Sequence, residues 1–565
     1  MVALPFANAY RAPAADASRS GGCRSRLSAT SAMVVHNSKI STGAMRAAGP
    51  RHEHDRERRP MTQAETAMVD DAAETRVVSI AQGAFRGAHT GSGWVFKGVP
   101  YAAPPVGEAR FDAPRPPVPH RGIADATDWG PTVSTPPQRS AVIDALLPDP
   151  HRHGENGLNL NLWTPDLEGS APVLVFIHGG GFVTGAGSTT AFDGTAFARD
   201  GVLAVTINYR LAVEGFALFP DAATNRGLRD QVAALEWIRD NIAAFGGDPA
   251  RVTIAGESAG AMAVCTLLAV PSARGLFHRA ISQSGTGHHV HTRAQAETVA
   301  AELGVELGVE ANARALTKIP VEELHTATNA VITRLTSGQD PRFAEFRRLV
   351  FQPVVDGDFL PEHPVDAIAA GAAADVDLLI GVNAEEYGLF VAPTGLADAM
   401  NAQVLTATTA RLCDNPGAML ATYREQLPEA SPAELFVAVQ SDWFCVAPTD
   451  RLLEARQAAG KASYAYQFAW RPTTFEGRLG TCHTLEVPFV FDTLDDPWGI
   501  ELRGADAPRE LATRVHGAWV AFVATGEPGW PTYGEDRTFC RLDLTLSLVQ
   551  DPLAFSREAW QGIAF

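Results

Sequence analysis

Short runs of strand length alternate with helical patterns after about residue 157, and this alternation constrains the fold more than any other feature. Residues 172–177 and 202–207 are almost wholly apolar, as strands buried on both faces of a sheet require. Residues 251–255 form another strand pattern, and before it apolar side chains recur every three or four positions over residues 229–245. Strands that alternate with helices in this way predict a mostly parallel sheet with helices on both faces.

Further strands and helices extend this pattern over most of the chain. Residues 77–80 and 94–99 are typical of short strands joined by glycine turns, which predicts a small antiparallel sheet on the N-terminal side. Other strands are predicted at 377–382 and 464–470, and helices within 292–336 and 396–440. Since no internal repeat and no clear linker interrupts the pattern, we expect residues 76–565 to be a single domain.

A Gly-x-Ser-x-Gly motif, Gly256-Glu257-Ser258-Ala259-Gly260, lies between the strand pattern and a run of helix-forming residues at 261–268. The motif alone is weak evidence, because an ordinary glycine turn can match it. A sharp strand–turn–helix connection, however, presents the serine hydroxyl above the edge of the sheet, and flanking glycines allow the backbone to pack closely. This context predicts that Ser258 is a nucleophile.

A second glycine motif, His178-Gly179-Gly180-Gly181, follows directly on the apolar run at 173–177. Preorganised backbone N–H donors stabilise developing negative charge on a carbonyl oxygen, each by about 2.7–4 kcal/mol. We expect Gly180, Gly181 and Ala259, the residue after the serine, to form such an oxyanion hole. A flexible loop or a phosphate cradle is the alternative, although the Lys-Ser/Thr ending of a phosphate-binding loop is missing.

Further motifs follow one another from about Val77 to the C-terminus. They are Phe96-Lys97-Gly98-Val99-Pro100-Tyr101-Ala102 with Pro105-Val106-Gly107, Leu158-Asn159-Leu160-Asn161-Leu162-Trp163, Asn208-Tyr209-Arg210, Gly246-Gly247-Asp248-Pro249, Ser282-Gln283-Ser284-Gly285, and finally Trp519, Phe522, Gly526, Pro528, Trp530 and Pro531. With the two glycine motifs, they closely resemble the type-B carboxylesterase family, which also holds the cholinesterases. The resemblance implies an α/β-hydrolase fold and a serine esterase that needs no metal or cofactor.

The family's triad is Ser–Glu–His in that chain order. Gly381-Val382-Asn383-Ala384-Glu385-Glu386 resembles its acid turn, whose last carboxylate is catalytic. The resemblance therefore assigns the acid to Glu386, with Glu385 as the rival one position earlier. Gly480-Thr481-Cys482-His483 resembles the histidine loop and assigns the base to His483.

Nothing but this match distinguishes His483 among the 16 histidines of the chain. His288, His289 and His291 lie nearer to Ser258 in sequence, and a metal site built from them is an alternative use of that cluster. Their spacing matches neither a helical pattern nor a zinc pattern, so we predict no metal.

The resemblance also implies a second shell of polar residues. Glu257, Ser284 and Glu486 would form a buried polar network behind His483, and the alternative for each is local hydrogen bonding without catalytic weight. The family often carries a disulfide between two cysteines, in whose regions this chain has Pro131-Thr132-Val133-Ser134 and Glu155-Asn156-Gly157, so that this bridge is absent. The same region lacks the tryptophan on which cholinesterases stack choline, which argues against a cholinesterase.

Composition excludes several classes of partner. A net charge of −18 cannot hold nucleic acid by neutralising its phosphates. No apolar run approaches the roughly 18 residues that a membrane-spanning helix needs. Six scattered cysteines without a C-x-x-C pair argue against a structural zinc site, and a missing family disulfide favours a reducing compartment. We therefore expect a cytoplasmic protein whose partner is a small ester. Its oligomeric state is not encoded in any pattern.

Residues 1–75 differ from the remainder of the chain. Residues 1–60 hold ten Lys or Arg and four Asp or Glu, a net charge of +6, so that the remainder carries −24. The segment shows no sustained periodicity, which predicts disorder. It also lacks the continuous apolar stretch of a secretory signal. We expect an extension without a catalytic role.

Three functions are compatible with these residues. The first is an esterase with a broad range of small esters. The second uses the same mechanism on a special bond, such as a carbamate, an amide or a lactone. The third is a non-catalytic adhesion-type relative, which would lack a triad member, whereas this chain has all three.

Overall fold

The computed structural model describes residues 74–137, 141–147, 149–346, 349–497, 499–563 and 565. These described residues belong to one compact unit. Most of the predicted N-terminal extension lies outside the described residues. Its predicted end at residue 75 differs slightly from the structure, because β1 already begins at Thr75.

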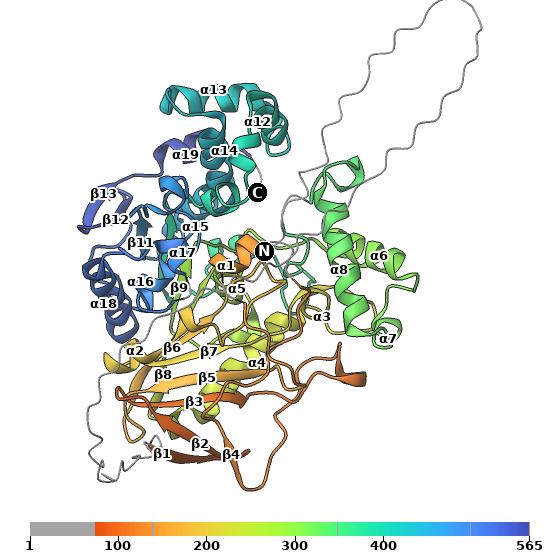
Figure 1. Cartoon of the computed structure of the whole chain (residues 1–565), viewed down its shortest axis with the longest axis vertical. Coiled ribbons are helices and arrows are strands. Elements are labelled where there is room, and N and C mark those ends of the chain that lie inside the picture. The colour runs from red at the N-terminus through yellow and green to blue at the C-terminus, as the bar shows by residue number, and fades with distance from the viewer. Residues whose placement is uncertain (1–73, 138–140, 148, 347–348, 498, 564) are drawn as a thin grey trace, which may run out of the picture. The chain divides into compact units, whose positions relative to one another are not determined.

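One large sheet runs through the described part of the chain, in the order β1-β2-β3-β5-β7-β6-β8-β9-β10-β11-β12-β13 (Figure 1). The strands are β1 Thr75–Ile80, β2 Gly83–His89, β3 Trp94–Pro100, β4 Ile123–Asp125, β5 Asn159–Thr164, β6 Ala171–Ile177, β7 Leu203–Ile207, β8 Gly247–Glu257, β9 Arg279–Gln283, β10 Asp377–Asn383, β11 Ser463–Phe468, β12 Thr538–Leu542 and β13 Ser547–Gln550. From β7 to β12 all neighbours are parallel. The predicted mostly parallel sheet is confirmed.

The N-terminal strands correct one detail of the prediction. β1, β2 and β3 pair antiparallel, as expected. They do not form a separate small sheet, because β3 pairs with β5 and β5 pairs with β7, so that they extend the main sheet. Alternating patterns show the pairing preference of a strand, but they do not show which edge of a sheet it joins.

Helices cover the sheet and connect its strands. The longer ones are α4 Arg226–Asn241, α5 Ala259–Leu267, α6 Arg293–Leu307, α8 Val321–Thr336, α12 Ala402–Thr409, α13 Pro416–Gln426, α14 Pro432–Ser441, α15 Ala447–Ala458 and α18 Arg509–Thr525. The predicted helix at 229–245 is observed as α4, which begins three residues earlier, followed by a 3-10 turn that ends at Gly246 with φ 81°. No helix among the described residues is long and apolar enough to cross a membrane.

The topology brings the candidate catalytic residues to one edge of the sheet. Ser258 directly follows β8, Glu386 lies three residues after β10, and His483 lies in the connection after β11. Because β8, β9, β10 and β11 are consecutive parallel neighbours, their carboxyl ends meet at the same edge. Residues far apart in sequence are thereby brought into one site.

Candidate active site

Ser258 occupies the sharp turn between β8 and α5. Its backbone has φ 57° and ψ −125°, a conformation that non-glycine residues rarely adopt and that costs about 1–3 kcal/mol. The turn is held because the N–H of Ser258 donates to the carbonyl of Gln283 at 2.9 Å. At Gly260 a Cβ would lie 1.9 Å from the carbonyl oxygen of Ile177, so glycine lets α5 approach β6. The predicted strand–turn–helix geometry is confirmed, whereas the role of Ser258 as nucleophile stays a prediction.

His483 and Glu386 form a short, fully buried hydrogen bond. Nδ1 of His483 lies 2.6 Å from Oε2 of Glu386, and neither side chain is exposed. The other oxygen of Glu386 accepts from the backbone N–H of Asn383 at 2.7 Å, which fixes the carboxylate. The structure thus places Glu386 against the imidazole of His483.

Glu257 approaches the opposite side of the same ring. Its Oε1 lies 3.2 Å from Nε2 of His483 and accepts a hydrogen bond from the hydroxyl of Thr484 at 2.7 Å. Burial raises the pKa of Glu257 to about 7, although the charge of His483 opposes this shift. For His483 burial acts in the opposite direction and lowers the pKa. The charges of Glu257 and Glu386 outweigh burial and hold the pKa of His483 above its ordinary value.

The Nε2 atom of His483 is buried and makes no hydrogen bond within the described part of the chain. In particular, none links it to Ser258 in those residues. Hydrogen bonds between a catalytic base and its nucleophile are often long without substrate and tighten in the substrate complex. The nitrogen is therefore available to accept a proton.

Behind the histidine lies a buried polar network around Glu486. Its two oxygens accept from Nε2 of Gln283 at 3.1 Å and from Nδ2 of Asn383 at 2.6 Å. Asn383 also donates to the carbonyl of Cys482 at 2.8 Å, and Trp519 donates to Gln283 at 3.2 Å. Burial and the nearby carboxylate of Glu386 raise the pKa of Glu486. The network connects the acid turn to the histidine loop.

The hydroxyl of Ser284 does not belong to this network, which corrects the prediction. It is buried and has no hydrogen-bond partner among the residues that the structure describes. The amide of the preceding residue, Gln283, already occupies the position on Glu486. Gln283 and Asn383 are therefore the polar residues that the sequence analysis missed, because a single amide side chain produces no recognisable pattern.

The glycine loop after β6 makes a tight turn beside Ser258. Gly180 has φ 106°, and a Cβ on it would lie 2.1 Å from the carbonyl oxygen of Thr184. Within the described ranges, no hydrogen bond uses the backbone N–H of Gly180, Gly181 or Ala259. Ala259 opens α5, where the first N–H groups of a helix lack intrahelical partners. All three predicted donors are thus available, and their role in an oxyanion hole stays a prediction.

A π-helix and the short helix α10, Gly388–Val391, place further residues around the imidazole. Asp442–Val446 joins α14 to α15 as one π-helical segment. The rings of Phe390 and Phe444 lie 5.7 and 5.6 Å from that of His483, and the thiol of Cys445 donates to the carbonyl of Ser284 at 3.3 Å. No sequence pattern indicated Cys445.

Cys445 also contributes to the one potential metal cluster of the described residues. Ligand atoms of Glu386, Cys445 and His483 lie within 4.8 Å of one another. Glu386 and His483 are already hydrogen-bonded to each other, so the cluster needs no ion to explain it. Among the cysteines that the structure describes, Cys265, Cys482 and Cys540 are free thiols.

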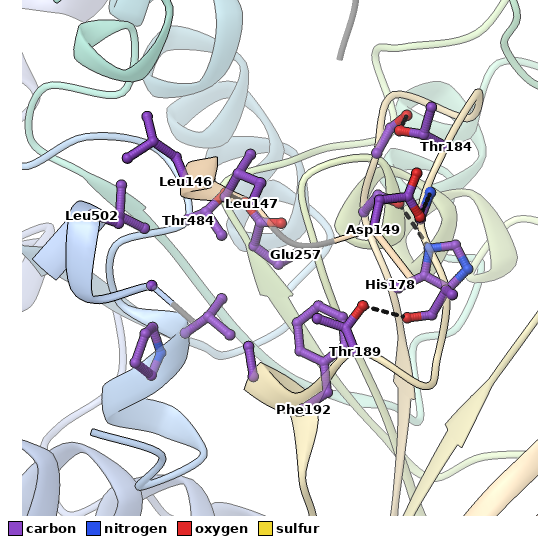
Figure 2. A pocket seen from close by; sticks show the side chains of 18 of the residues that line it. Leu146, Leu147, Asp149, His178, Thr184, Thr189, Phe192, Glu257, Thr484 and Leu502 are labelled. Atoms are coloured by element: carbon purple, nitrogen blue, oxygen red, sulfur yellow. Dashed lines mark hydrogen bonds between the residues drawn. The ribbon is translucent and has the colours of Figure 1, made fainter. Parts of the chain in front are cut away.

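A cavity of about 90 Å³ lies beside this site. Figure 2 shows Leu146, Leu147 and Leu502 on one side of Glu257, with His178 and Asp149 on the other. Gly179 and Gly180 also line it, whereas Ser258 and His483 do not. Since a Cβ on Gly179 would lie 3.0 Å from Cβ of Ser258, the cavity adjoins the serine through this glycine. Burial lowers the pKa of His178 to about 4, so this ring is neutral.

Comparison with known proteins decides the family. The model of the carboxylesterase family matches residues 74–551. The chain belongs to the carboxylesterase family. The para-nitrobenzyl esterase of Bacillus subtilis (strain 168) is 36% identical over 86% of this chain and 98% of its own. The phenmedipham hydrolase of Pseudarthrobacter oxydans is 36% identical over 78% of this chain and 90% of its own.

Solved structures agree with this carboxylesterase assignment. A crystal structure of the Geobacillus stearothermophilus carboxylesterase at pH 6.2 has a TM-score of 0.76 and 36% sequence identity, and the match covers 86% of this chain and all of that one. This chain therefore has the α/β-hydrolase fold. It is an enzyme that acts on carboxylic ester bonds.

Proposed function

We propose that this carboxylesterase hydrolyses esters through a Ser258–His483–Glu386 triad and a covalent acyl-enzyme. The observation that supports it best is the buried 2.6 Å contact between His483 and Glu386 at the sheet edge where Ser258 occupies a strained turn. Glu386 holds the imidazole in one tautomer, with Nδ1–H donating to the carboxylate. Nε2 is then the unprotonated nitrogen that faces the end of β8.

The reaction follows from these positions. Nε2 of His483 takes the proton of Ser258 Oγ as this oxygen attacks the ester carbonyl carbon. The N–H groups of Gly180, Gly181 and Ala259 hold the oxyanion of the tetrahedral intermediate. The imidazolium returns its proton to the leaving alcohol. A water molecule, deprotonated by the same nitrogen, then cleaves the acyl-enzyme and restores Ser258. Glu386 stabilises the imidazolium in both halves.

The test is hydrolysis of p-nitrophenyl acetate and butyrate by the wild type and by Ser258→Ala, with fluorophosphonate labelling in parallel. We expect labelling at Ser258 and a loss of kcat of at least about a thousandfold in the variant, as for other triad serines. Ser463→Ala is a matched control, because this serine is also buried but lies at the start of β11, at the opposite end of this strand from the proposed triad, where it accepts from Nε of Arg456. Wild-type protein that neither turns over nor labels would contradict the triad.

The small cavity suggests a limit on substrate size. An apolar cavity of about 150 Å³ holds benzene, so 90 Å³ accommodates a smaller group, such as a short alkyl chain. Two ester series test this, one with the acyl chain lengthened from acetate to octanoate and one with the alcohol lengthened from methyl to octyl. We expect one series to lose kcat/KM sharply beyond a short chain, and Leu146→Ala to extend that limit. Two equally flat series would contradict a role for the cavity.

The choice of bond remains part of the proposal. Relatives include a fumonisin B1 esterase of Sphingopyxis macrogoltabida, 31% identical over 79% of this chain, as well as the para-nitrobenzyl esterase. Relatives named for such different substrates justify a panel that adds carbamates, amides and lactones to simple esters. We also propose a cytoplasmic location, which the free thiols of Cys265, Cys482 and Cys540 support.

A further inference from the structure

Glu385 is adjacent to the proposed catalytic acid, but its side chain contacts Thr481 and Arg471 instead of His483. Its Oε2 accepts from the backbone N–H of Thr481 at 2.9 Å, and its Oε1 lies 3.0 Å from Nη1 of Arg471. The carboxylates within 4 Å of the imidazole of His483 in the described structure are those of Glu386 and Glu257. Glu385 is therefore not a substitute for the acid, although it is the rival by sequence.

The contacts of Glu385 lie two residues before the histidine. The backbone N–H of Glu385 donates to the carbonyl of Thr481 at 3.0 Å, so Glu385 and Thr481 bond in both directions. The N–H of His483 itself donates to the carbonyl of Glu386 at 3.0 Å. The acid turn and the histidine loop are thus joined residue by residue, and the side chain of Glu385 supplies the outermost connection.

The chain is shaped to accept this carboxylate. Gly480 has φ 61°, and a Cβ on it would lie 2.5 Å from Oε2 of Glu385. Thr481 is buried, and its hydroxyl donates to the carbonyl of Trp470 at 3.1 Å. A buried N–H that loses its acceptor is strongly unfavourable, so the loop would have to move if the carboxylate of Glu385 were removed.

We propose that Glu385 is a positioning residue, whose carboxylate fixes Gly480 and Thr481 so that the imidazole of His483 stays aligned with Ser258. This inference rests on the proposed triad. The two neighbouring carboxylates then have different roles. Glu386 orients the imidazole ring, and Glu385 orients the loop that carries His483. A displacement of a catalytic group by about 1 Å can lower a rate about 100-fold. The contact of Glu385 with Thr481, two residues before His483, is therefore expected to affect kcat.

The experiment compares Glu385→Ala with Glu385→Gln on p-nitrophenyl butyrate, with rates divided by the number of fluorophosphonate-reactive sites. We expect Glu385→Ala to lower kcat per active site about tenfold or more, with KM little changed, since the loop shift misaligns His483. Glu385→Gln keeps an oxygen that accepts from Thr481 and should retain most of kcat. Glu425→Ala, on an exposed face of α13, is the matched control.

A double-mutant cycle ties the effect to the contact with Gly480. Gly480→Ala brings a methyl group against the carboxylate, so it should lower kcat per site in the wild type and do so less in Glu385→Ala. Independent effects would overturn the proposal, as would a Glu385→Ala protein that has a lower Tm but the wild-type kcat per site. Loss of turnover in Ser258→Ala tests the triad separately. Wild-type protein without esterase activity would overturn the triad, whereas an active wild type with insensitive Glu385 variants overturns only this proposal.

Discussion

At the scale of single residues, each nitrogen of the His483 imidazole lies against a different carboxylate. Glu386 contacts Nδ1 at 2.6 Å and Glu257 contacts Nε2 at 3.2 Å. The first contact orients the ring. The second lies on the nitrogen that accepts a proton in the proposed mechanism, so we expect it to act chiefly through charge. Glu257 and His483 are close enough to titrate as a pair rather than as independent groups.

This pair predicts the effect of Glu257→Gln on the pH dependence. Catalysis needs neutral His483, so activity falls as the pH drops through the pKa of this group. The negative charge of Glu257 helps to raise that pKa, and its removal should therefore lower the pKa. We expect the acidic limb of the kcat/KM profile to move to lower pH. Profiles of kcat/KM from pH 5 to 9 measure this shift. An acidic limb that stays in place would show that the charge of Glu257 does not affect the pKa of His483.

The chain itself indicates only part of this residue-scale picture. Ser258 could be predicted because its motif lies between a strand and a helix, a local pattern. Glu386 and His483 could be chosen only by resemblance, because nothing local distinguishes them from Glu385 or from other histidines. The contact of Glu257 with His483 depends on how two distant loops meet, and this is fixed by packing rather than by a motif.

At the scale of elements, the close approach of α5 to β6 determines where Ser258 lies. Gly260 permits this approach, since a Cβ at this position would lie 1.9 Å from the carbonyl oxygen of Ile177. Gly260→Ala would force the helix and strand apart or distort the turn. We expect a loss of more than about 2 kcal/mol in unfolding free energy, in the range of overpacked cores, together with loss of esterase activity. Urea unfolding and p-nitrophenyl butyrate turnover measure the two effects.

Gly517 offers the matched control for this substitution. It lies exposed within α18, and a Cβ there would meet nothing within 4 Å. Gly517→Ala should therefore stabilise the protein by about 0.5–1 kcal/mol, because alanine is the better helix former. Equal effects of the two substitutions would show that α5 can shift without cost.

Element boundaries were predictable where a pattern was continuous. Residues 173–177 are buried on both faces of β6, and their apolar run indicated this directly. The start of α4 at Arg226 was missed by three residues because its first turn, Arg-Gly-Leu, buries an arginine side chain instead of presenting a periodic apolar face. The π-helix at Asp442–Val446 could not be predicted, since its one extra residue per turn leaves no separate sequence signal.

At the scale of the whole molecule, the described part of the chain holds every residue of the proposed triad. The family match begins at residue 74, β1 begins at Thr75, and Ser258, Glu386 and His483 all lie in connections that follow strands of one sheet, β8, β10 and β11. The class of fold was predictable because the alternation of strands and helices spans hundreds of residues. The joining of the N-terminal strands to the main sheet was not, because it depends on pairing between distant segments.

This arrangement predicts the outcome of removing residues 1–73. The family match and the sheet both start after this segment, so a protein of residues 74–565 should keep the kcat, KM and Tm of the full chain. Kinetics with p-nitrophenyl butyrate and thermal unfolding, run side by side on the two proteins, provide the measurement. A lower Tm would mean that the first 73 residues stabilise the domain. A lower kcat at unchanged Tm would place them in the function of the site, and the first strand would then no longer mark the start of the functional enzyme.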